Sequence, residues 1–140
     1  MPTITVTLTP EQARVVRDAV DLVERLYLGQ LDELLHFYRD HLHRPGEVTG
    51  FRRLRIKELL ETVKLEVFPE LDGGPGHSYG VGSPQLPKDA KRLYEIYKVL
   101  DHALWLTHPE KDRQQWCRAA DDPYMLNYSG DAKIPFEVKP

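Results

Sequence analysis

Residues 3–13 read TITVTLTPEQA, and this segment contains both a strand pattern and a helix start. Residues 3–8 alternate threonine with a large apolar side chain, which is typical of a half-buried strand. Thr9 then provides a capping oxygen, Pro10 suits the first position of a helix, and Gln12 follows three residues after the cap. We therefore expect a strand that leads directly into a helix. The apolar side of the expected strand consists of Ile4, Val6 and Leu8.

Apolar residues continue at spacings of three and four from Pro10 to about His43, just before Pro45-Gly46. This period predicts one long helix, which would span about 50 Å at 1.5 Å per residue. Such a helix is longer than a small globule, so we expect part of it to project or to pair with a second copy. Similar periods predict a second helix over 51–67, a third over 88–107 and a short one near 110–118.

Alternation returns at the C-terminus, where Ile134, Phe136 and Val138 are separated by polar residues or proline. Pro135 would confine this strand to the edge of a sheet. The predicted fold is α+β and mainly helical, with three main helices, the first one long, and a small antiparallel sheet that pairs the N- and C-terminal strands. Residues 1–140 are expected to form a single domain with a Gly/Pro-rich loop over 69–87.

Composition excludes several classes of protein. With 140 residues and a net charge of −3, the chain is too short for a TIM barrel and too acidic for a general nucleic-acid coat protein. No apolar run approaches the length of a membrane span, and the first residues lack the basic start of a signal peptide. Cys117 is the single cysteine, which fits a reducing compartment. We expect a cytoplasmic protein that contacts no membrane.

The sequence Gly76-His77-Ser78-Tyr79-Gly80 matches the nucleophile motif G-x-S-x-G. That motif needs a strand before the serine and a helix after it, and the pattern predicts neither here. Asp101 and His108 follow Ser78 in the chain order of a hydrolase triad. We favour a glycine-rich loop, which could still bind an anion through its backbone amides. We expect no catalytic residue and no enzyme activity.

Histidines gather near the end of the long predicted helix. Asp32, His36 and Asp40 recur at four-residue steps, with His41 and His43 nearby, so metal binding is one interpretation. The alternative is that cationic histidines complement the helix dipole. We favour the second interpretation and expect no metal and no cofactor.

Five basic residues occur within fourteen positions of this acidic chain. One interpretation is the solvated first half of a helix. However, cations at a helix N-terminus oppose the helix dipole, which favours an external acidic partner. The predicted partner-binding residues are Arg44, Arg52, Arg53, Arg55 and Lys57.

The order of several short motifs resembles that of small phage-encoded proteins. In size and in its thermophile-like composition, the chain is similar to the RNA polymerase-binding inhibitor and antiterminator proteins of Thermus bacteriophages. This resemblance implies a non-enzymatic protein that docks on the β-flap of host RNA polymerase, inhibits promoters and allows terminators to be read through. It implies no direct DNA specificity. The motifs are Leu8-Thr9-Pro10-Glu11-Gln12-Ala13, Gly29-Gln30, Ser78-Tyr79-Gly80 and Tyr94-Glu95-Ile96-Tyr97-Lys98-Val99.

A second resemblance, to the anti-Thoeris proteins of phages, implies a different function. Those proteins evade immunity by sequestering a cyclic nucleotide or a cyclic ADP-ribose signal at a dimer interface. The alternative prediction is therefore a small nucleotide ligand and a homodimer. The pocket residues for this alternative are Arg55, Ser78, Tyr79, Arg92 and Tyr97.

Overall fold

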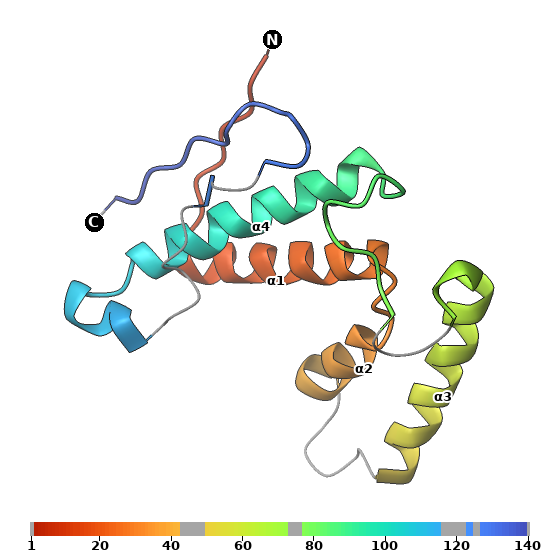
Figure 1. Ribbon diagram of the computed structural model, residues 1–140. Helices are drawn as coiled ribbons and strands as arrows, with labels where there is room; N and C mark the ends of the chain where they lie inside the picture. The colour runs from red at the N-terminus through yellow and green to blue at the C-terminus, as the bar shows by residue number, and fades with distance from the viewer. Residues whose placement is uncertain (1, 43–49, 73–76, 116–122, 125–126, 140) are drawn as a thin grey trace.

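The computed structural model describes residues 2–42, 50–72, 77–115, 123–124 and 127–139, and these residues are mainly helical (Figure 1). Two long helices lie side by side, while a third of similar length stands away from them beside a short helical segment. In chain order the elements are α1 (Pro10–Tyr27), α2 (Glu33–Phe37), the π-helix η1 (Tyr38–Leu42), α3 (Gly50–Val67), the 3₁₀ helix η2 (Pro69–Leu71), α4 (Lys88–Leu106) and the 3₁₀ helix η3 (Glu110–Gln115).

The start of α1 confirms the helix start predicted at Thr9. The Thr9 hydroxyl accepts a hydrogen bond from the backbone N–H of Gln12 at 3.3 Å. In return, the Gln12 side chain accepts one from the N–H of Thr9 at 3.0 Å. Two free amides of the first turn are thus satisfied, and Pro10 occupies a position that needs no amide.

The predicted long helix is wrong, because α1 ends at Tyr27 and the chain turns at Gly29. Gly29 has a φ of 84°, a left-handed conformation that suits glycine. Its N–H donates to the carbonyl of Leu26, and the N–H of Gln30 donates to that of Arg25. This hydrogen-bond pattern closes the C-terminus of a helix. The long period therefore covers α1 and, after the turn at Gly29, the contiguous helical segments α2 and η1.

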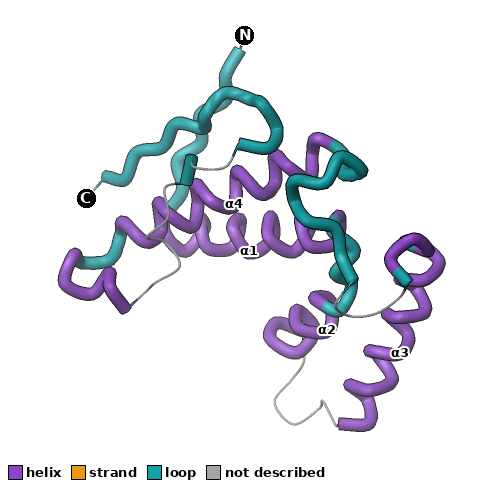
Figure 2. Tube along the Cα trace, viewed as in Figure 1, coloured by secondary structure: helices purple, strands orange, loops and turns teal. Residues whose placement is uncertain are grey.

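The predicted antiparallel sheet is also wrong, since no described residue forms a strand (Figure 2). Residues 2–9 are extended, but they are exposed, with Ile4 92% and Val6 69% accessible. The C-terminal segment packs on α4 instead: the ring of Phe136 meets that of His102 edge to face, and Asp131 binds Lys88. An alternating pattern shows that every second side chain faces an apolar surface, but not what that surface is. For residues 134–138 the surface is helix α4 rather than a second strand.

Helices α1 and α4 are antiparallel and form the main packing unit. Arg17 in the middle of α1 and Asp101 in the second half of α4 form an ion pair at 3.1 Å. At the C-terminal end of α1, Leu28 packs with Leu86 and Ala90. The apolar core is small, and no large side chain among the described residues is fully buried. The buried apolar residues are Leu28, Leu31, Leu35, Leu86, Ala90, Val99 and Leu104.

Candidate functional site

Residues 77–87 form a joint between α1, α3 and α4. The backbone N–H of Tyr79 donates to the carbonyl of Leu28 at 2.9 Å, which ties the segment to the end of α1. From α3, the ammonium of Lys64, only 3% exposed, donates to the carbonyl of His77. Part of the predicted Gly/Pro-rich loop thus connects the end of α1 with the C-terminal half of α3 through hydrogen bonds.

A cavity of about 410 Å³ lies at this joint, between the C-terminal ends of α1 and α3 and the segment before α4. Its lining is mostly aliphatic and aromatic, with Tyr27, Phe68 and Tyr79 as the three rings. The Tyr79 hydroxyl donates to the Glu70 carboxylate. That hydrogen bond lowers the pKa of Glu70 and raises the pKa of Tyr79. Sequence reasoning missed this cavity, because its lining comes from four separate segments.

The serine motif is not arranged for nucleophilic catalysis. Ser78 is exposed and accepts a hydrogen bond from the Gln30 side chain at 3.4 Å. Asp101 instead binds Arg17, which lies 11 residues before Leu28, or about 16 Å along α1. Ser78, Asp101 and His108 are therefore not brought together as a catalytic triad. Ser78 instead takes part in a hydrogen bond at the joint.

One carboxyl group, that of Glu24 in α1, is buried with 7% of its surface exposed. Its pKa is raised to about 7, mainly by burial and also by the nearby negative charge of Asp21, whereas the positive charge of Arg25 opposes both effects. Glu24 is not among the residues that line the cavity. The raised pKa therefore results from the burial of Glu24 between packed elements, and it affects how the stability of the fold depends on pH.

The basic cluster lies on the first two turns of α3. Arg52, Arg53, Arg55 and Lys57 are all exposed, and Lys57 approaches Glu61 at 3.9 Å. Arg44 lies outside the described residues. The same two turns also carry two large apolar side chains that are exposed, Phe51 at 79% and Leu54 at 54%. Cationic and apolar side chains are therefore both accessible on these two turns. The sequence predicted the basic residues as a binding surface, but it did not predict the exposure of Phe51 and Leu54.

The residues of the alternative ligand pocket lie on three different elements. Arg55 is on α3, Ser78 and Tyr79 are in the joint, and Arg92 and Tyr97 are on α4. Of these, Tyr79 lines the cavity, and the lining includes no lysine or arginine.

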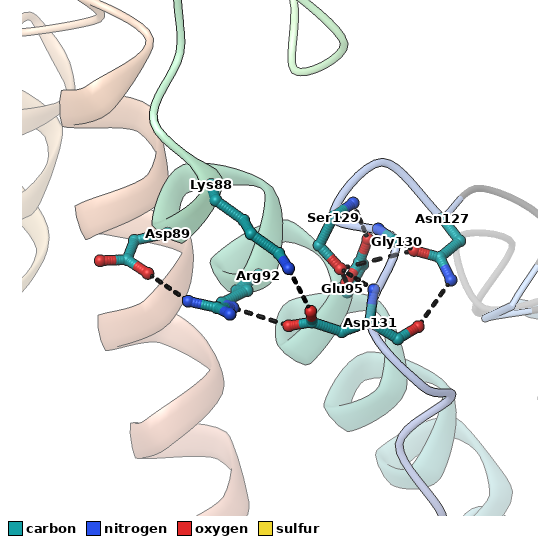
Figure 3. A network of polar contacts seen from close by, with 8 residues as sticks. All are labelled: Lys88, Asp89, Arg92, Glu95, Asn127, Ser129, Gly130 and Asp131. Carbon is teal, nitrogen blue, oxygen red and sulfur yellow. Dashed lines mark hydrogen bonds and ion pairs between the residues drawn. The ribbon is translucent and has the colours of Figure 1, made fainter.

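Arg92 belongs to a polar network that connects α4 with the C-terminal segment (Figure 3). It binds Asp131 at 2.6 Å and Asp89 at 2.9 Å. Hydrogen bonds from Arg92 and Lys88 lower the pKa of Asp131 to about 2. Glu95 of α4 also accepts hydrogen bonds from the backbone N–H and hydroxyl of Ser129. These contacts hold the C-terminal segment on α4, so Arg92 performs a structural task.

The histidine cluster is not arranged as a metal centre in the described part of the chain. There, no three His, Cys, Asp or Glu side chains are grouped to hold a metal ion. His36 contacts Glu33 at 3.4 Å, and the ring of His41 packs against that of Phe37. His43 lies outside the described residues.

None of the described helices combines the length and the apolar character that a membrane crossing needs. No protein-family profile matches the chain, and neither a curated protein nor a solved structure is significantly similar to it.

Proposed function

We propose that this chain is a non-enzymatic phage protein that binds a host protein in the cytoplasm and modulates transcription. The partner that the sequence resemblance names is the host RNA polymerase. The observation that carries the proposal is the surface on the first two turns of α3, which exposes both the basic cluster and the apolar side chains of Phe51 and Leu54. We call this surface the basic–apolar face.

The chemistry of this face suits a protein partner. Aromatic and arginine side chains dominate the binding energy of many protein interfaces, because they bury area and make several hydrogen bonds. Phe51 is 79% exposed, so its burial on binding would be favourable. The four cations of the cluster would match an acidic rim on the partner and would increase the association rate.

Binding to purified bacterial RNA polymerase tests the proposal. We expect the wild-type chain to co-elute with polymerase and to reduce initiation at promoters in a purified transcription reaction. The double reversal Arg53→Glu with Lys57→Glu should weaken binding at least tenfold and reduce its dependence on salt. Lys111→Glu with Lys139→Glu makes the same charge change on η3 and on the C-terminal segment, and it should leave binding unchanged.

Two results would overturn the proposal. The first is the absence of any complex with core polymerase or with the holoenzyme at micromolar concentrations. The second is an equal loss of affinity in the α3 variant and its control, which would mean that net charge alone governs the interaction.

A further inference from the structure

We propose that α3 pairs antiparallel with α3 of a second copy of this chain, around a two-fold axis near Glu61. The contact uses an apolar stripe of α3, formed by Ile56, Leu59, Val63 and Val67. This inference does not depend on the identity of the host partner, since the stripe lies on the side of the helix opposite to Phe51 and Leu54.

The first argument is the accessible surface of the single chain. The chain exposes 10129 Å². A compact monomer of 16.2 kDa exposes about 7,400 Å² by the usual scaling with mass, so about 2,700 Å² is in excess. Stable homodimers commonly bury 1,000 Å² or more per subunit. A single chain therefore carries more open surface than one dimer interface requires.

The second argument is the pattern along α3. The stripe residues are spaced by three, four and four positions, which places them on one side of a helix at about 100° per residue. Leu59, Val63 and Val67 are 58%, 49% and 58% exposed. Ile56 at the start of the stripe is half-buried. This spacing is that of a seam between two packed helices.

The third argument is charge. The first half of α3 carries Arg52, Arg53, Arg55 and Lys57, whereas Glu61 and Glu66 lie in the second half. An antiparallel partner lays the basic half of each helix along the acidic half of the other. The same arrangement brings the arginines near the negative dipole end of the partner helix, which relieves the opposition to their own helix dipole.

These arguments converge on one register. An antiparallel pair that sets Ile56 against Val67 also sets Leu59 against Val63, to within one residue. In that register, Arg55 of one copy lies within two residues, about 3 Å along the axis, of Glu66 of the other. Arg55 and Glu66 lie about 20° apart around the helix, on the same edge of the stripe, so the axis creates this ion pair twice.

The opposite side of α3 stays open in such a dimer. Phe51, Leu54 and Leu65 lie there, about 150° around the helix from the stripe. The dimer therefore leaves most of the basic–apolar face available to a host partner.

Molar mass in solution tests the pairing. We expect the wild-type chain to behave as a dimer, with twice the 16.2 kDa of the chain, in sedimentation equilibrium at micromolar concentrations. Val63→Glu, in the middle of the stripe, should yield a monomer with unchanged helix content by circular dichroism. The matched control Leu65→Glu changes a residue of similar exposure, 50%, on the opposite side and should remain a dimer.

A charge swap tests the antiparallel orientation. Glu66→Arg should raise the dissociation constant of the dimer about tenfold, because two attractive contacts become repulsive. Combining it with Arg55→Glu should restore the wild-type value, since the pairs re-form with exchanged signs. In a parallel pair, Arg55 of one copy would lie about 16 Å along the axis from Glu66 of the other, so the double variant would give no rescue. A wild-type monomer, a Val63→Glu dimer or a failed rescue would each overturn the proposal.

Discussion

Replacing Glu24 by glutamine should make the protein more stable above neutral pH and reduce the dependence of its stability on pH. Glu24 is 7% exposed, and burial is the main cause that raises its pKa from 4.5 to about 7. In the unfolded chain the same carboxyl ionises in water near its ordinary pKa. Glutamine has nearly the same shape but no charge to bury, so the substitution removes the unfavourable ionisation and preserves the packing.

The sign follows from proton binding. Between pH 4.5 and 7 the folded protein keeps the Glu24 proton while the unfolded chain releases it. The free energy of unfolding therefore falls as pH rises through this window, by about 1.4 kcal/mol for each unit of difference in pKa. A difference of about 2.5 units, from 4.5 to about 7, corresponds to about 3 kcal/mol, fully developed above pH 8.

Urea unfolding followed by circular dichroism at pH 4, 6 and 8.5 measures this effect. Relative to wild type, Glu24→Gln should gain close to nothing at pH 4 and about 3 kcal/mol at pH 8.5. Glu58→Gln, at an exposed position of α3, should show no such pH-dependent gain. If Glu24→Gln and wild type lose stability in parallel as pH rises, the carboxyl is not the cause and the reasoning is refuted.

Three further predictions concern the joint and the ligand alternative. Gly29→Ala should destabilise the fold by about 1–2 kcal/mol in urea, because φ is 84° and a new Cβ would meet the Leu71 side chain at 2.6 Å. Lys64→Ala should increase amide exchange in residues 77–81 and leave the middle of α4 unchanged, since the ammonium holds the carbonyl of His77. Cyclic ADP-ribose should not raise the melting temperature, because the cavity lining includes no lysine or arginine. If the chain were a nucleotide-sequestering protein, the ligand would stabilise the fold by about 2.7 kcal/mol at a hundredfold excess over Kd.

The sequence predicted those elements whose ends are fixed by local chemistry. Thr9 and Pro10 fix the start of α1 as predicted, and proline and glycine limit α3 and α4, so the ranges of α3 and α4 agree with the expected ones to within one residue. Gly29 was the available signal for the end of α1, but a continuous apolar period outweighed it. Period alone does not distinguish one long helix from two helices joined by a glycine turn.

The sheet was predicted wrongly and the cavity was missed because both depend on contacts between segments that are far apart in the sequence. Alternation in residues 3–8 and 134–138 indicates extended backbone, but it does not identify what each segment packs against. The C-terminal segment contacts α4 through Asp131 and Phe136, whereas Ile4 and Val6 of the N-terminal segment are exposed. The candidate site is similar: the arginines of α3 were visible in the sequence, whereas the exposure of Phe51 became visible only once α3 was seen to stand apart.

The open surface of the chain is larger than one interface explains. A standard protein interface buries about 800 Å² per partner, less than a third of the excess of about 2,700 Å². The exposed apolar groups also lie in separate places: the stripe on α3, the basic–apolar face around Phe51, and the N-terminal segment with Ile4 and Val6. A chain that only dimerised would leave the last two uncovered, and a chain that only bound a host protein through Phe51 would leave the stripe uncovered. Two kinds of partner, a second copy and a different protein, account for this distribution better than either one alone.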